Sequence, residues 1–141
     1  MPLYFAYGTN MDRAGMRRRC PDARALGTGT LEGWRLLVMR DGYLSIARRR
    51  GARVHGVLWR LTPRDLAALD AYEAVDSGLY RRCALPVLAG GRPASAQVYV
   101  GRRPAPGRPR PGHLPVVLAA ARSWNLPAAY LDELQQWAEG R

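Results

Sequence analysis

Two segments of this chain carry residue types suited to acid–base and oxyanion chemistry, and the first is residues 7–10. Here Tyr7-Gly8-Thr9-Asn10 ends an apolar run and leads into a helix-like segment. A strand that stops at a glycine just before a helix leaves backbone N–H groups unpaired, and such groups bind a carboxylate or a developing oxyanion. Gly8 lets a ligand approach the main chain, while Thr9 and Asn10 add side-chain hydrogen bonds. An ordinary turn with Asn10 as a helix cap is the alternative interpretation.

The second segment is the region around Glu73, which we place at the C-terminal end of a helix. The helix dipole disfavours a negative charge there. Leu69 and Tyr72 precede Glu73 at helical spacing, which predicts its partial burial. Both effects raise the pKa of a carboxyl group toward the range that is useful to a general base at neutral pH. The alternative is a solvated surface glutamate paired with Arg81 or Arg82.

The chain lacks the residues that several other catalytic chemistries require. The chain contains no Lys, which excludes a lysine Schiff base, pyridoxal phosphate attachment and a P-loop lysine. His55 falls in an expected strand and His113 in a loop, with no carboxylate or Cys at metal-ligand spacing, so we assign them core or surface roles. Cys20 and Cys83 lack nearby His and fit reduced thiols. We therefore expect neither a metal nor a cofactor.

Capping residues and apolar runs in the sequence predict the helices and strands that must position these two segments. An apolar strand over residues 3–7 precedes Gly8, and a short helix over residues 11–19 follows with Asn10 as its N-cap. Thr62 caps a helix that ends near Glu73, with proline at its first position. Strand-like pieces punctuated by glycines are expected over residues 25–40, of which 34–39 is the clearest, and further strands over 43–47, 54–61, 80–88 and 94–100. A turn is expected at 76–78, a mobile loop over 102–112, and closing helices over 113–124 and 128–137. Many short strands with a few helices indicate an α+β class, in which a barrel-like sheet hides its edges.

Composition and charge limit the partners. At 141 residues the chain is long enough for a sizeable core, and we expect residues 1–141 to form one domain. No apolar run is long enough to cross a bilayer and the N-terminus lacks a signal-peptide pattern, so we expect a cytoplasmic protein without a membrane partner. The net charge of +11 would suit nucleic acid. However, all 22 basic residues are scattered Arg in a chain rich in Ala, Gly and Pro, which indicates GC-rich codon usage and disfavours a nucleic-acid partner.

In order, these segments resemble the signatures of the γ-glutamylcyclotransferase-like (AIG2-like) family. Residues 4–11, Tyr-Phe-Ala-Tyr-Gly-Thr-Asn-Met, are similar to its N-terminal YGSN signature. Residues 54–61 running into 69–73, followed by Tyr80-Arg81-Arg82, resemble its second signature: a strand reading xGxxWxL, a helix ending LDxxE, and a downstream Tyr and Arg. Residues 96–100 and 126–130 also have family counterparts. Each motif is weak alone, but the ordered set covers nearly the whole chain.

The resemblance implies a fold and a reaction. The fold is a small mixed β-barrel of short strands with flanking helices. The reaction is a metal-independent carbon–nitrogen lyase or acyl-transfer step, in which the α-amine of a small γ-glutamyl substrate attacks its own γ-amide carbonyl to give 5-oxoproline and a released amine or amino acid. Glu73 would move the proton, in a monomer or a homodimer. The substrate-binding residues implied by position are Tyr7, Gly8, Thr9, Asn10, Tyr80 and Tyr99.

Two departures from the family pattern bear on specificity. Thr9 replaces the usual serine, and residues 111–115, Pro-Gly-His-Leu-Pro, lack the tyrosine that follows a Pro-Ser segment in many relatives. The alternative function is a non-catalytic basic binding module on the same fold, which would hold nucleic acid or an acidic partner through the arginines of residues 17–19, 48–50 and 102–110. The residues do not predict the leaving group.

Overall fold

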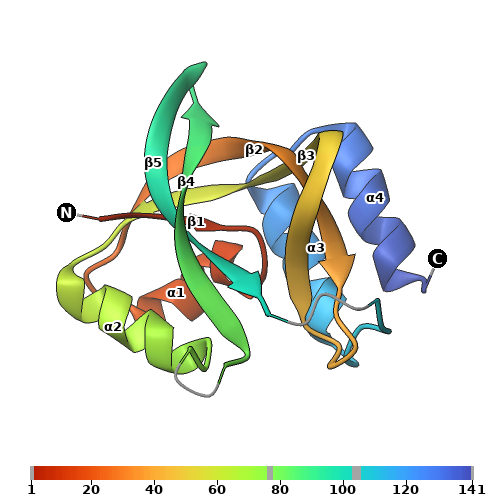
Figure 1. Cartoon of the computed structure of the whole chain (residues 1–141), viewed down its shortest axis with the longest axis horizontal. Helices are drawn as coiled ribbons and strands as arrows, with labels where there is room; N and C mark the ends of the chain where they lie inside the picture. Colours follow the sequence, from red (N-terminus) through yellow and green to blue (C-terminus); the bar gives the residue numbers. More distant parts are fainter. Residues whose placement is uncertain (1, 76–77, 103–105, 141) are drawn as a thin grey trace.

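The protein is built on a closed five-stranded barrel, described here from a computed structural model that covers residues 2–75, 78–102 and 106–140. The strand order around the barrel is β1-β3-β2-β4-β5 (Figure 1). Only the closing pair, β1 with β5, is parallel; the other pairs are antiparallel. The expected small mixed barrel with flanking helices is therefore confirmed. The strands are β1 (Leu3–Ala6), β2 (Arg24–Val38), β3 (Leu44–Arg60), β4 (Tyr80–Ala89) and β5 (Arg92–Gly101).

Two strands are continuous where the sequence indicates separate pieces. The arginine-rich residues 48–53 belong to one strand of 17 residues, β3, in which residues 49–52 form a bulge between the pairs Arg48–Trp34 and Arg53–Glu32. Its partner β2 runs for 15 residues through two register shifts, at Ala25/Gly27 and Glu32/Trp34. Gly27 and Gly33 have φ of 126° and 83° at these points. Irregularities of this kind bend a strand instead of ending it, and here they curl the long β2–β3 ribbon around the core.

Helices flank the barrel in two groups. They are η1 (Thr9–Met11), α1 (Arg13–Arg19), α2 (Pro63–Tyr72), α3 (His113–Ser123) and α4 (Ala128–Ala138). Figure 1 shows α1 and α2 together on one side and α3 and α4 on the other. The cap expected for α2 is confirmed, because Thr62 Oγ1 accepts a hydrogen bond from Asp65 N at 3.0 Å. The cap expected for the first helix is wrong: Asp12, not Asn10, accepts from Gly15 N, because a 3-10 turn intervenes.

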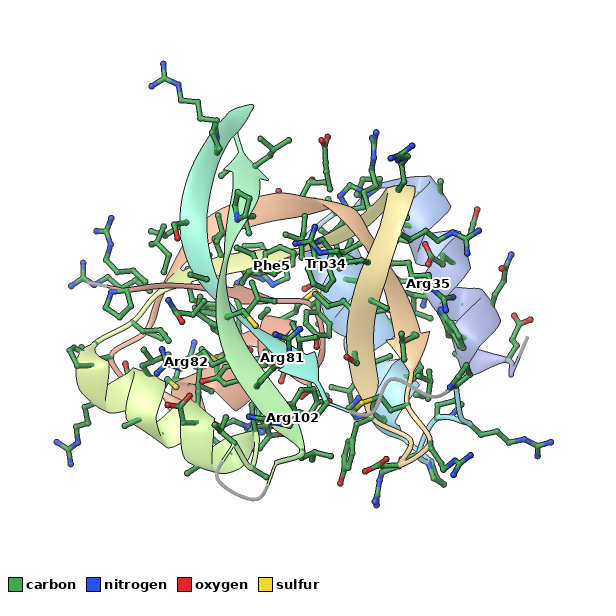
Figure 2. All side chains as sticks on the ribbon, viewed as in Figure 1. Phe5, Trp34, Arg35, Arg81, Arg82 and Arg102 are labelled. Atoms are coloured by element: carbon green, nitrogen blue, oxygen red, sulfur yellow. The ribbon has the colours of Figure 1, made fainter. Side chains whose placement is uncertain are left out.

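The core fixes the position of β1 and therefore of the loop that follows it. Phe5 is fully buried, and Figure 2 shows its side chain among the barrel strands together with that of Trp34. Gly56 allows β3 to lie close to β1, since a Cβ at that position would overlap the carbonyl oxygen of Ala6 and contact the Phe5 ring. The residues after Ala6 thus leave the barrel at a fixed point.

Two expected connections are only partly described. The turn expected at residues 76–78 lies outside the described residues except for Gly78, and the loop expected at 102–112 does so at residues 103–105. The rest of that loop is held: Gly107 N donates to the Val38 carbonyl at 2.8 Å, and Arg110 N to the Gly42 carbonyl at 3.1 Å. Among the helices described, none has the length and apolar character needed to span a membrane.

Candidate active site

A cavity of about 340 Å³ opens where β1, α2, β4 and β5 meet. It brings together every site residue expected from the sequence. Those residues line it together with others that sequence reasoning did not select. The expected ones are Tyr7, Gly8, Thr9, Asn10, Glu73, Tyr80 and Tyr99, and the additional ones include Tyr4, Tyr43, Leu44, Tyr72 and His113.

The loop after β1 presents its backbone to this cavity. Gly8 has φ −118° and ψ −139°, and the nearest atom to a Cβ built there would be Leu44 Cδ1 at 4.0 Å, so the space over Gly8 is open. Its N–H has no hydrogen-bond partner among the residues described. Thr9 and Asn10 begin the η1 turn and have no N–H partner within it. The loop can therefore donate backbone hydrogen bonds to an anionic or oxyanionic ligand.

The side chain of Asn10 is held by protein groups. This residue is only 3% exposed and its side chain faces the protein. Its Nδ2 donates to Tyr4 Oη at 3.0 Å, and its Oδ1 accepts from Arg19 Nη1 at 2.7 Å. The Asn10 side chain thus holds the loop in place, and one N–H of the amide has no further partner among the described residues.

Three tyrosines form the wall of the cavity with their hydroxyl protons already committed. Tyr7 Oη donates to the Tyr99 carbonyl at 2.6 Å, and Tyr80 Oη donates to the Leu44 carbonyl. Tyr99 Oη donates to Asp70 Oδ1 at 2.7 Å. Burial raises the pKa of all three phenols above the ordinary value, so they stay neutral. These side chains shape the cavity and are unsuited to proton transfer.

Glu73 is the acidic group of the cavity. It caps the C-terminus of α2, whose last turn contains no basic residue. Burial raises the pKa of Glu73 to about 7, and the smaller opposing effect comes from the charge of Arg19. Within the described residues no hydrogen bond or ion pair reaches its carboxylate; Arg82 is paired with Asp70 instead, at 2.9 Å. The surface ion pair considered as an alternative is thus not found in this part of the chain.

The backbone just after Glu73 is strained. Ala74 has φ of 52°, a left-handed conformation that costs a residue with a Cβ roughly 1–2 kcal/mol. Two hydrogen bonds enforce it: Ala74 N donates to the Ala71 carbonyl at 3.2 Å, and Val75 N donates to the Asp70 carbonyl at 3.1 Å. This is the Schellman closure of a helix, in which glycine is usual. The helix end that carries Glu73 is therefore held in one conformation.

Sequence reasoning missed His113 and the tyrosines of residues 4 and 43. His113 is the first residue of α3 and packs edge-on against Tyr43, with ring centroids 6.0 Å apart. Burial, and then the charge of Arg110, lower the pKa of His113, so it is neutral at pH 7. No local signal points to this position, because a strand or helix pattern does not tell which distant elements will meet. The described residues include no group of three or more His, Cys, Asp or Glu that could hold a metal ion.

The arginines do not gather at the cavity. The runs at residues 17–19 and 48–50 lie on α1 and β3, and the third run includes residues outside the described ones. Figure 2 shows nitrogen-tipped side chains projecting around the whole outline of the molecule. The basic binding module stays a prediction that no observation here favours.

Comparison with known proteins identifies a family and agrees with the fold. The sequence profile of the family described as gamma-glutamyl cyclotransferase, AIG2-like, matches residues 4–125. Human gamma-glutamylcyclotransferase is 26% identical over 144 aligned residues, which cover 94% of this chain and 77% of the human protein. The mouse protein of the same name is 27% identical over the same shares of the two chains.

Solved structures give the same result. A structure named gamma-glutamyl cyclotransferase matches with a TM-score of 0.88 and 25% identity, over 95% of this chain and 86% of that one. YkqA from Bacillus subtilis, at 24% identity, shares the fold with a TM-score of 0.82 over 96% of this chain and 53% of its own. The chain therefore belongs to the gamma-glutamyl cyclotransferase, AIG2-like family.

Proposed function

We propose that this protein is a γ-glutamylcyclotransferase-type enzyme that converts a γ-glutamyl amide or peptide into 5-oxoproline, with Glu73 as its general acid and base. The family and the fold support a cyclotransferase activity. The observation that carries the assignment to Glu73 is its placement: a carboxyl group with a pKa of about 7, in the same cavity as the loop at Gly8. Such a group is half ionised at neutral pH, which suits both taking up and returning a proton.

The reaction then follows from the groups in the cavity. Ionised Glu73 takes a proton from the substrate's α-ammonium group, and the free amine attacks the γ-carbonyl carbon of the same molecule. A carbon–nitrogen bond forms, and the loop N–H groups, including that of Gly8, stabilise the oxyanion. Protonated Glu73 returns its proton to the departing nitrogen, and the original amide bond breaks. The attacking nitrogen also gives up its second proton, which leaves with the departing amine, so the products are a five-membered lactam and an ammonium ion, with atoms and charge balanced.

The shape of the cavity supports the same substrate class. At about 340 Å³ it lies at the small end of ligand sites and has room for a γ-glutamyl head group. The walls formed by Tyr7, Tyr80 and Tyr99 restrict how that head group bends. Holding the amine near the carbonyl lowers the entropic part of the barrier. The substrate supplies the nucleophile, Glu73 carries the proton and the loop N–H groups hold the oxyanion, so we propose a metal-independent reaction without a cofactor.

The test is a release assay for 5-oxoproline by mass spectrometry over a panel of γ-glutamyl amino acids, peptides and amines. We expect turnover by the wild type and a loss on the order of 10²–10⁴-fold in Glu73→Gln, because the amide cannot transfer the proton. Glu133→Gln is the matched control, since Glu133 is also partly buried with a raised pKa but lies on α4, away from the cavity. Retained turnover in a folded Glu73→Gln protein would refute the acid–base role. Absence of turnover by the wild type on every panel member would refute the substrate class.

A further inference from the structure

Arg19 differs from the arginines beside it. It is the last residue of α1 and is partly buried, whereas Arg17 and Arg18 are exposed. Its Nη1 donates to Asn10 Oδ1 at 2.7 Å, and its guanidinium carbon lies 4.3 Å from the centroid of the Tyr72 ring. One side chain therefore contacts both the loop that follows β1 and the residue immediately before Glu73.

The contact with the loop fixes more than one atom. Because Asn10 Oδ1 faces a guanidinium, its Nδ2 must point the other way, where it donates to Tyr4 Oη at 3.0 Å. Tyr4 belongs to β1 and is buried. The chain of contacts runs from α1 through the loop into the barrel, so the loop backbone is held relative to α1.

The contact with Tyr72 brings a positive charge close to Glu73. Arg19 is the basic group that opposes the effect of burial on the pKa of that carboxyl. The phenols that interact with Glu73 are Tyr4 from β1, Tyr7 after it and Tyr80 from β4, and burial keeps all of them neutral.

The other ionisable groups near Glu73 are either neutral or already in an ion pair. His113 of α3 lines the same cavity and is neutral at pH 7. Asp70, one turn earlier on α2, is paired with Arg82. Among the described residues that face the carboxyl, Arg19 is therefore the cation that acts on it.

We propose that Arg19 is the positioning residue of this site: it couples the loop at Asn10 to the helix end at Glu73 and places a positive charge at that helix end. The proposal rests on the proposed function for its meaning in catalysis and for the KM test of the coupling, but not for the NMR test of the charge. A planar guanidinium is needed for the first task, because it stacks on Tyr72 and donates to Asn10 at once. The second task needs only a positive charge. Two substitutions therefore separate them.

The charge is tested without substrate, by a ¹³C NMR titration of the glutamate carboxyl groups. The chain contains only a few Glu residues, and the Glu73→Gln variant identifies the signal of Glu73 by its loss. In Arg19→Met we expect the midpoint of Glu73 to rise by on the order of one pH unit, since an opposite charge has been removed. Arg18→Met, which removes a charge from an exposed position on the same helix, should leave the midpoint unchanged. An unchanged midpoint in a folded Arg19→Met protein would overturn the proposal.

The geometry is tested by Arg19→Lys. We expect this variant to keep the midpoint of Glu73 close to that of the wild type, and to raise KM several-fold with little change in kcat, because the loop that binds the substrate is less firmly held. The chain has no other Lys, so labelling with ε-¹⁵N-lysine reports the introduced ammonium group alone. A wild-type KM in Arg19→Lys would overturn the coupling role. If no substrate is turned over at all, the proposed function fails, whereas the NMR result still decides the effect of the charge.

Discussion

The C-terminal ends of α2 and α3 are closed by the same backbone motif, but they differ in the residue at the left-handed position and in the charge of the last turn. In α3 the left-handed position is Asn125, with φ of 56°, and Leu126 N donates to the Ala121 carbonyl at 3.2 Å. The last turn carries Arg122, whose charge complements the helix dipole. Trp124 anchors this end through Nε1, which donates to the Met11 carbonyl at 2.8 Å.

The end of α2 departs from each of these preferences. Its left-handed residue is Ala74, its last turn has no basic residue, and its cap is the acid Glu73. Each departure lowers the stability of the helix end, while α3 shows that the same fold accommodates the favourable choices. Strain and unfavourable charge of this kind tend to collect where function requires them. The comparison therefore singles out the α2 end as the part of the molecule under a constraint other than stability.

The largest effect should be a pH dependence of stability that comes from Glu73. Its pKa is about 7 in the folded protein against 4.5 ordinarily, so the folded state binds the proton more tightly. The stability that this proton contributes is present below pH 4.5 and is lost as the pH rises to about 7, by about 2 kcal/mol after allowing for solvent screening of a partly exposed group. Urea unfolding at pH 5 and pH 8 measures it. Glu73→Gln should show a smaller loss between these pH values; an equal loss in both proteins would mean that Glu73 is not the group responsible.

A smaller effect should follow from exchanging the left-handed residues. Ala74→Gly should raise the free energy of unfolding by about 1 kcal/mol, because relief of the Cβ clash outweighs the extra entropy of glycine in the unfolded chain. Asn125→Ala should lower it by about the same amount, since it brings to α3 the strain that α2 already has. Denaturant unfolding of both variants beside the wild type is the measurement. A loss of stability in Ala74→Gly would show that the alanine is not strained.

The smallest effect concerns the charge at the end of α3. Arg122→Met should cost about 0.5 kcal/mol by removing a cation from the negative end of the helix dipole. Arg122→Lys is the control that keeps the charge, and it should cost less. Thermal unfolding at low and moderate salt should show the difference between the two variants shrinking as salt rises. Equal losses in both variants would assign the effect to the hydrogen bond that Arg122 donates to Gln135.

Patterns of neighbouring residues predict many of the helices and strands. They also predict the two segments that form the site, the loop at Gly8 and the helix end at Glu73. Thr62 and the proline after it placed the start of α2 correctly, because capping depends on residues adjacent in the chain. The same signal is misleading at Asn10, because this polar residue precedes a helix whose cap is Asp12. The sequence pattern also divides β3 in two, because residues 49–52 have no partner on β2, and a bulge inside a strand has the same sequence pattern as a break between two strands.

The site itself was only partly accessible to local reasoning. The loop at Gly8 and the carboxyl of Glu73 were selected from their own segments, whereas Tyr80 and Tyr99 came from the family resemblance. His113 was assigned elsewhere. Nothing in its segment indicates that the start of α3 would pack against Tyr43 beside the cavity.

The sequence by itself determined the backbone character of the two key segments: a glycine that leaves N–H groups unpaired, and an acid at the end of a helix that does not favour it. Both follow from interactions within a few residues. Only the tertiary structure decided what surrounds them. The hydrogen bond from Tyr7 to Tyr99 joins residues 92 positions apart, and Arg19 is distinguished from its identical neighbours only by the side chains that other elements bring to it. Burial and electrostatic coupling depend on such distances, and a pattern along the chain does not contain them.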